Sequence, residues 1–147
     1  MISQTSIHAI RAMMYLAAQK ENQPIGAALI ATAIEAPANY LGKTLQILTL
    51  NGLLNSQRGL GGGVKLAREA DQISLYDIVE PIEHVSRQSR CFMNRLCCGP
   101  EPCRFHERWA GIHRDYCDFL KSISLKQIVE QNQVDSRNFK MPGIRKD

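Results

Sequence analysis

Apolar residues in the first 50 positions recur with the period of amphipathic helices. This pattern predicts a first helix over residues 6–21, ended by the polar segment 22–24, and a second, short helix over residues 25–34. A tight turn at 35–36 follows. Pro37 suits the first turn of a third helix, because the N–H that proline lacks would have no partner there. The sequence thus begins with three helices, the last two joined by a tight turn.

The third helix has an apolar inner face and a polar outer face. Its inner face carries Leu41, Leu45 and Leu48 at positions i, i+4 and i+7, and Gly52 suits the cap after its last turn. The outer face is predicted to present polar side chains near the N-terminus: Asn39, Tyr40, Lys43, Thr44 and Gln46. Two short helices with a polar outer surface on the second are typical of a helix-turn-helix, whose second helix reads the major groove. A plain packed helix pair is the alternative at this point.

A glycine-rich hairpin follows and favours the DNA-binding interpretation. Strands are predicted over residues 53–57 and 64–67, joined by Arg58-Gly-Leu-Gly-Gly-Gly. Such a tip can approach another surface closely, and Arg58 and Lys65 add positive charge. A phosphate-binding nucleotide loop is excluded, because the glycines lack a following Gly-Lys-Ser/Thr and helix. The fold class is therefore mainly α, a winged helix-turn-helix with a small β-hairpin wing. The predicted DNA-binding residues are Asn39, Tyr40, Lys43, Thr44, Arg58, Gly61 and Gly62.

The second half of the chain predicts three more helices. Ser74 caps one, which Pro81 is expected to kink or stop, and residues 83–90 read as a polar connector. A long helix over residues 104–122 carries large apolar side chains at heptad-like spacing: Phe105, Trp109, Ile112, Tyr116, Phe119 and Ile123. We expect this stripe to pack against its copy in a homodimer; packing back onto its own domain is the alternative.

A capping box at residues 124–127 opens a last short helix, and the tail is polar. The expected organisation is a winged-helix domain at residues 1–83, a cysteine-rich loop at 84–106, the dimerisation helix and short final helix at 104–131, and a disordered tail at 132–147.

Composition and net charge indicate the kind of partner and the cellular compartment. The 147 residues carry a formal net charge of +4, which suits a polyanion partner. Five cysteines form an odd count that fits a closed disulfide framework poorly. The sequence shows no secretory leader and no apolar run long enough to span a membrane, so we expect a cytoplasmic protein without a membrane partner. In a reducing compartment, clustered thiols point to metal or redox chemistry.

The cysteines gather in residues 91–106. Cys91, Cys97 and Cys103 are separated by equal gaps of five residues, and His106 stands three positions after the last. Three thiolates and one imidazole suit an iron–sulfur cluster, most of all [2Fe–2S], with [4Fe–4S] the second choice. Zinc and a thiol redox site remain alternatives. Cys98 could replace Cys97 or be a free thiol, and Cys117 is expected to be a buried helix cysteine.

These motifs together resemble the iron–sulfur cluster regulator family of bacterial winged-helix transcription factors, the group of IscR, NsrR and RirA. The resemblance covers roughly residues 5–130 and is carried by the wing at 57–63, the segment 73–79 and the cysteine spacing. It implies that Asn39, Tyr40 and Lys43 lie on the recognition helix and that Arg58 enters a minor groove. It also implies the IscR-type ligand set: Cys91, Cys97, Cys103 and His106.

Some positions depart from the family pattern. Ile7 stands where the nitric-oxide branch has a ligating aspartate, with His8 beside it as another conceivable ligand. Cys98 is additional, Gly42 replaces a base-reading acid, and Pro37 replaces a hydroxyl residue. The first departure favours the IscR-type set, whereas the others leave the DNA target open.

The function expected from the sequence is transcriptional regulation, with repression of a palindromic operator controlled by the cluster. Loading, oxidation or loss of the cluster would reshape the loop beside the dimerisation helix and so change DNA affinity. The signal would be iron–sulfur status, redox stress or nitric oxide. The alternatives are a thiol-redox or metabolite-responsive regulator without a cluster, and an iron–sulfur electron or cluster carrier. No nucleophile–base motif or carboxylate pair indicates an enzyme.

Overall fold

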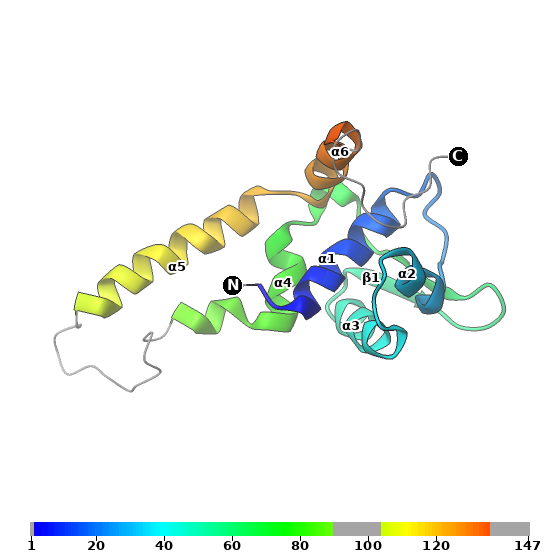
Figure 1. The fold of residues 1–147 in the computed structure, drawn as a ribbon, viewed down its shortest axis with the longest axis horizontal. Helices are drawn as coiled ribbons and strands as arrows, with labels where there is room; N and C mark the ends of the chain where they lie inside the picture. Colours follow the sequence, from blue (N-terminus) through cyan, green and yellow to red (C-terminus); the bar gives the residue numbers. More distant parts are fainter. Residues whose placement is uncertain (1, 90–103, 136–147) are drawn as a thin grey trace.

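Helices dominate the computed structural model, which describes residues 2–89 and 104–135 (Figure 1). Within those residues the elements are α1 (Gln4–Ala17), α2 (Ala27–Ala33), α3 (Ala38–Leu50), β1 (Leu54–Gln57), β2 (Gly63–Leu66), the 3₁₀ turn η1 (Ala70–Gln72), α4 (Leu75–Glu83), the 3₁₀ turn η2 (Val85–Ser89), α5 (Arg104–Ser122) and α6 (Leu125–Asp135). The predicted fold class, mainly helical with a β-hairpin wing, is confirmed.

The ends of the first two helices differ from the prediction. Helix α1 begins two residues earlier, because the Oγ of Ser3 caps it by accepting the N–H of Ser6 at 3.3 Å. It ends at Ala17 rather than at residue 21. Helix α2 begins only at Ala27, because Ile25 pairs with Val64 instead: each N–H donates to the other's carbonyl at 2.9 Å. Ile25 therefore extends the wing sheet as an isolated bridge.

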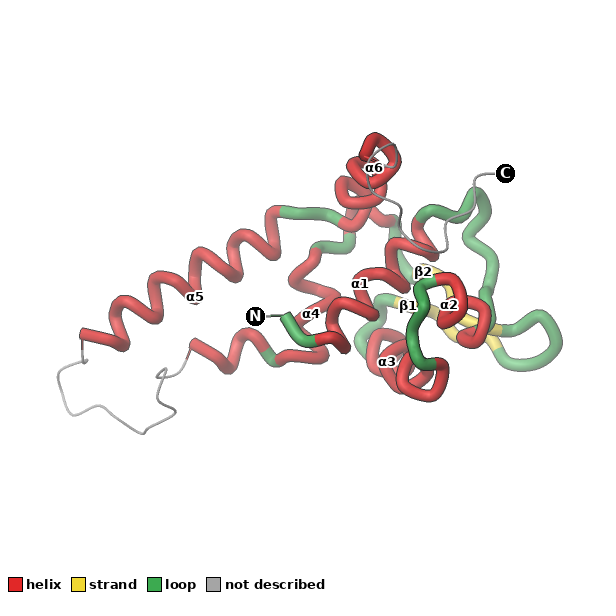
Figure 2. The backbone as a smooth tube through the Cα atoms, viewed as in Figure 1, coloured by secondary structure: helices red, strands yellow, loops and turns green. Residues whose placement is uncertain are grey.

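The wing is an antiparallel hairpin in which Leu54 pairs with Leu66 and Gln57 with Gly63. The hairpin tip and the free end of α5 lie at opposite ends of the long axis of the molecule (Figure 2). At Gly63 the backbone has φ +155°, and an added Cβ would lie 2.2 Å from the carbonyl oxygen of Ile25. Only glycine therefore allows the wing to pair with the segment before α2.

Replacing Gly63 by alanine is expected to destabilise the fold by about 2 kcal/mol, because the Ile25–Val64 bridge must open or the backbone must strain. Thermal or urea unfolding measures the change. Gly42→Ala in α3 is the matched control, since nothing lies within 4 Å of its added Cβ. The control should be neutral or stabilising by about 0.5–1 kcal/mol. Equal stability of the two variants would contradict this account of the wing.

Two apolar clusters form the core. The larger joins α1, α2, α3 and the wing, and includes Met13, Ile30, Leu41 and Leu48. The smaller lies between α4, η2 and α5 and includes Val79, Val85, Cys117 and Leu120. Helix α6 returns to the main body, where Leu125 joins the larger cluster. Helix α5 is thus held at its C-terminal end while its N-terminal end projects away (Figure 1).

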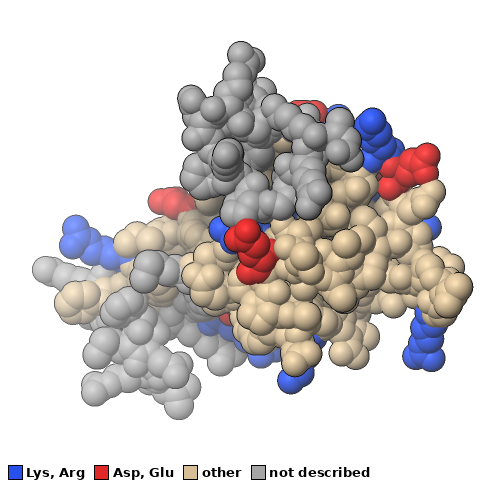
Figure 3. Space-filling view, turned by 45° about the vertical axis from the view of Figure 1, so that its right-hand side comes forward, with Lys and Arg blue, Asp and Glu red and all other residues tan. Residues whose placement is uncertain are grey.

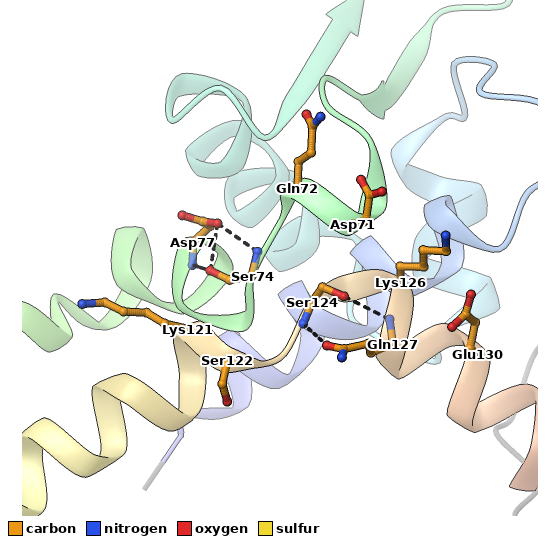
Figure 4. A pocket seen from close by; sticks show the side chains of 10 residues that line it. All are labelled: Asp71, Gln72, Ser74, Asp77, Lys121, Ser122, Ser124, Lys126, Gln127 and Glu130. Atoms are coloured by element: carbon orange, nitrogen blue, oxygen red, sulfur yellow. Dashed lines mark hydrogen bonds between the residues drawn. The ribbon is translucent and has the colours of Figure 1, made fainter.

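The starts of α4 and α6 lie beside each other and are both capped by a serine (Figure 4). Ser74 and Asp77 form a capping box, and Ser124 and Gln127 bond in the same reciprocal way. The two segments are joined by backbone bonds from Leu75 to residue 123 and from residue 125 to residue 73. This junction joins the start of α6 to the winged-helix body.

The remaining differences concern the second half. Pro81 lies inside α4 and does not end it at once; the helix runs on to Glu83 and is followed by His84, which adopts φ 51°. The predicted polar connector contains η2 and buries Val85. Helix α5 spans the predicted 104–122, whereas α6 continues to Asp135, past the expected residue 131. The predicted tail from 136 onward lies outside the described residues.

Candidate DNA interface and cysteine segment

The first turns of α3 present an exposed polar surface. Asn39, Lys43 and Gln46 are exposed, and Tyr40 is 47% exposed. The leucines on the opposite side of the helix are buried in the larger cluster. Because α2 packs against α3 and the core holds both, this surface is presented on a rigid support. The predicted placement of Asn39, Tyr40 and Lys43 on the outer face therefore agrees with the structure.

Thr44 does not lie on that face, and its predicted placement was wrong. Its side chain is only 2% exposed, and its hydroxyl donates to the carbonyl of Tyr40 at 3.3 Å. Thr44 stands three residues after Leu41 and four before Leu48, which places it beside the leucines of the inner face. A hydroxyl can occupy this position because the preceding turn accepts its proton.

The hairpin tip exposes Arg58, Leu60 and Gly61. Gly62 is half-buried, its N–H donates to the carbonyl of Gly59 at 2.9 Å, and an added Cβ would lie 2.4 Å from the carbonyl oxygen of Gln57. Gly62 therefore closes the turn, whatever it contacts outside. Sequence reasoning missed Leu60, whose side chain is fully exposed; a single leucine among glycines at a hairpin tip was the available signal.

The charge on this side of the molecule is sparse. Figure 3 shows lysine and arginine side chains at the edges of the face and mostly uncharged residues between them. Lys43 on α3 and Arg58 on the wing are exposed, and Lys65 is half-buried. Such a surface suits a few positioned phosphate contacts rather than a broad basic field.

The described residues do not include Cys91, Cys97, Cys98 and Cys103. Of the predicted ligand set, the structure therefore describes only His106. His106 stands in the first turn of α5 and is half-buried. Within the described part of the chain, its Nδ1 has no hydrogen-bond partner, and neither does the Nδ1 of His8. Residues 2–89 and 104–135 contain no group of three potential metal ligands. A free imidazole nitrogen beside a thiol-rich segment fits the donor set of an iron–sulfur cluster.

Helix α5 has a buried face and an exposed apolar face rather than the predicted single stripe. His113, Cys117 and Leu120 form a buried face against α4 and η2, and the predicted burial of Cys117 is confirmed. Tyr116 and Ile123, which belonged to the predicted stripe, are half-buried against the same cluster. Trp109 is half-buried as well, and the three remaining stripe residues are exposed at a spacing of seven: Phe105 at 78%, Ile112 at 62% and Phe119 at 53%.

The buried face ties α5 to η2. The Nε2–H of His113 donates to the carbonyl of Val85 at 2.7 Å, and the Sγ of Cys117 lies 3.7 Å from Nε2. Burial raises the pKa of the Cys117 thiol, with the nearby Lys121 acting against it. A neutral buried thiol is a poor nucleophile, so Cys117 packs rather than reacts.

A polar hollow of about 550 Å³ lies where η1 meets the starts of α4 and α6 (Figure 4). Lys121 and Lys126 line it together with Asp71 and Glu130, so its charges have both signs. The caps of the two helices already engage the serine hydroxyls there. The hollow therefore favours neither an anionic nor a cationic ligand.

Comparison with known proteins identifies the family. Residues 2–131 match the Rrf2 family, described as "Iron-dependent Transcriptional regulator". The chain belongs to the Rrf2 family. Its relatives include the HTH-type transcriptional regulator IscR of Xenorhabdus nematophila, which is 30% identical over 127 residues, 86% of this chain and 77% of that protein. The IscR of Photorhabdus laumondii is 29% identical over the same length.

Solved structures place Rrf2-type regulators beside this fold. CymR, the global cysteine regulator of B. subtilis, matches with a TM-score of 0.73 and 25% identity over 89% of this chain and 97% of that one. The IscR of T. potens matches with a TM-score of 0.72 and 22% identity over 95% and 92% of the two chains.

The Rrf2 assignment confirms the predicted resemblance and the predicted function class, a DNA-binding transcriptional regulator that is not an enzyme. It favours a regulator over the iron–sulfur carrier considered from the sequence. The described helices include none that is both long and apolar enough to cross a membrane.

Proposed function

We propose that this Rrf2-family chain is a homodimeric repressor whose binding to a palindromic operator is controlled by an iron–sulfur cluster. One observation carries the proposal: the cysteine segment joins η2, which packs on the winged-helix body, to α5, which projects an open apolar face. A change in that segment can therefore alter how two DNA-reading units are held relative to each other.

The DNA side rests on α3 and the wing. Asn39, Tyr40 and Lys43 face outward where a recognition helix offers its first turns to base edges. Arg58 stands at the flank of the exposed tip, where an arginine can enter a minor groove. Gly61 leaves the tip backbone open to phosphates, and Lys65 adds charge at its other flank.

The dimer rests on the open apolar face of α5. Phe105, Ile112 and Phe119 repeat every seven residues, the spacing at which two helices pack side by side. A twofold pair of such helices places two recognition helices in a symmetric arrangement, which matches a palindromic operator.

The cluster would be held by Cys91, Cys97, Cys103 and His106, with [2Fe–2S] favoured and [4Fe–4S] second. When bound, it supplies a redox-active inorganic centre whose loading reports iron–sulfur status, redox stress or nitric oxide. His106 must be neutral to ligate, and its Nδ1 is without a partner among the described residues. We place this regulator in the cytoplasm, where the thiols stay reduced.

The direct test is anaerobic purification followed by an absorption spectrum and assays of iron and acid-labile sulfide. DNA selected from a random-sequence pool with the same preparation supplies the operator for binding measurements. Visible absorbance with iron and sulfide, together with a recovered palindrome, is the expected result. A colourless protein free of iron would reject the cluster.

A second candidate is a regulator that responds to thiol oxidation without a cluster. The likeness to CymR favours it: the B. subtilis protein is a global cysteine regulator, and S. aureus CymR has been crystallised in an oxidised form, each at 25% identity to this chain. This candidate predicts a colourless anaerobic protein whose operator affinity changes with peroxide and recovers with dithiothreitol.

Replacing Arg58 by alanine is expected to weaken operator binding by about tenfold, or about 1.4 kcal/mol, because the wing loses its minor-groove contact. Fluorescence anisotropy with the selected duplex measures it. Arg114→Ala is the control: it removes the same charge from an exposed position on α5, the helix that extends away from the wing (Figure 1). Thermal unfolding should be unchanged in both. If the two variants bind equally, Arg58 has no special role.

A further inference from the structure

The first turn of α1 lies between the C-terminal end of α4 and the N-terminal end of α3. On one side, the backbone N–H of Ser3 and the hydroxyl of Ser6 both donate to Oε1 of Glu83, at 2.6 and 2.8 Å. On the other side, the hydroxyl of Thr5 is hydrogen-bonded to the hydroxyl of Tyr40 on the recognition helix. One helical turn therefore contacts both elements through polar groups.

The contact with Glu83 is partly shielded from solvent. Ser6 is fully buried and Glu83 is half-buried. Burial raises the pKa of Glu83, but the hydrogen bonds from Ser3 and Ser6 outweigh it, so the pKa lies below its ordinary value and the group is ionised at neutral pH. Hydrogen bonds to an ionised carboxylate are stronger than those between neutral groups, so they hold the first turn of α1 against α4.

The same end of α4 is hydrogen-bonded to η2, and η2 in turn is hydrogen-bonded to α5. The N–H and hydroxyl of Ser86 in η2 donate to the carboxylate of Glu80. His113 of α5 donates a hydrogen bond to the carbonyl of Val85 in η2. The pKa of Tyr116 in α5 is raised, mainly by burial and secondly by the negative charge of Glu83. Polar contacts thus run from α5 and η2 through α4 and α1 to Tyr40.

We propose that Thr5 and Glu83 are positioning residues for DNA binding. Glu83 of α4 holds the first turn of α1, and Thr5 in that turn holds the side chain of Tyr40, so the position of α4 determines where Tyr40 lies. This rests on the proposed role of Tyr40 in contacting the operator. Tyr40 is about half exposed, so without a partner its ring would sample several rotamers. Holding its hydroxyl lowers the entropy lost when it contacts DNA.

The variants that test this are Thr5→Val, which keeps the shape and removes the hydroxyl, and Glu83→Gln, which keeps the shape and removes the charge. Thr5→Ser retains the hydroxyl and is the rescue variant. Asp77→Asn is the matched control, because it makes the same acid-to-amide change on α4 at the other end of the helix, where the carboxylate serves the Ser74 cap.

Affinity for the duplex selected with the wild-type protein is measured by fluorescence anisotropy at a fixed salt concentration. Each variant is first checked to be dimeric and folded. We expect Thr5→Val and Glu83→Gln each to weaken binding at least about threefold. The double variant should bind no more weakly than Thr5→Val, because Glu83 acts through the same turn. Thr5→Ser should restore wild-type affinity, and Asp77→Asn should lower the melting temperature without changing affinity.

The proposal is overturned by single effects that multiply in the double variant, or by a Thr5→Val variant that binds as the wild type does. Tyr40→Ala separates this failure from failure of the proposed function. If Tyr40→Ala binds normally, Tyr40 does not read the operator, and both the positioning role and that part of the function are rejected. If Tyr40→Ala weakens binding and Thr5→Val does not, only the positioning role is rejected.

Discussion

Alanine at Cys91, Cys97 or Cys103 is expected to abolish the visible absorbance of the anaerobic protein and to change its operator affinity by at least about tenfold. The reason is that each substitution removes one thiolate from a set of four ligands, and clusters are held by all of their ligands. Loss of a ligand or its close partner in metal sites costs about 10–100-fold in affinity or more. Spectra, iron and sulfide content and anisotropy on the same samples measure both effects.

Cys117→Ala and Cys98→Ala are the controls for these variants. Cys117 is buried in the cluster between α4 and α5, so its replacement should lower stability by about 1 kcal/mol and leave the absorbance intact. Cys98→Ala should also keep the absorbance if Cys97 is the ligand. If all three ligand variants keep their visible absorbance, the ligand set is rejected. If Cys98→Ala loses the absorbance and Cys97→Ala keeps it, Cys98 rather than Cys97 is the ligand.

Glutamate at Ile112 is expected to dissociate the dimer and to weaken operator binding by about 100-fold or more, because two linked half-site contacts become independent. Ile112 is 62% exposed at the centre of the open apolar face of α5, between Phe105 and Phe119. Burying a carboxylate between apolar side chains costs its hydration free energy. Sedimentation and anisotropy of the same preparation measure assembly and binding.

Arg114→Glu is the matched control for Ile112→Glu. Arg114 is exposed two residues further along the same helix, hence on nearly the opposite face. It should remain dimeric with operator affinity within about threefold of wild type. A dimeric Ile112→Glu variant, or one that binds no more weakly than the control, would contradict the assignment of this face.

The helix-turn-helix and the wing could be predicted because their signals are local. The spacing of Leu41, Leu45 and Leu48 defines one face, and the glycines after Arg58 define the hairpin. Helix ends were less accurate, because Ser3 as a cap and Ile25 as a strand partner depend on contacts rather than on periodicity. Thr44 was placed on the outer face because its side chain is polar, although its helical spacing from Leu41 and Leu48 puts it beside the buried leucines.

The candidate site could be predicted only in part. The sequence places Asn39, Tyr40 and Lys43 outward correctly, but it treats α5 as one stripe, because His113 and Cys117 are not counted as strongly apolar. The bond between Ser6 and Glu83 joins residues 77 positions apart, and no local pattern signals such a pair. The cysteine ligand set stays a prediction, since residues 90–103 lie outside the described part of the chain.

The most direct test of the central claim compares one wild-type preparation before and after anaerobic removal of its iron by a chelator. Operator affinity is measured on both forms at the same salt concentration, and the cluster is quantified by absorbance, iron and sulfide. We expect the two forms to differ in operator affinity by at least about tenfold, as an allosteric coupling of about 1.4 kcal/mol requires. Equal affinity of the loaded and the iron-free dimer for the selected duplex would contradict control of DNA binding by the cluster.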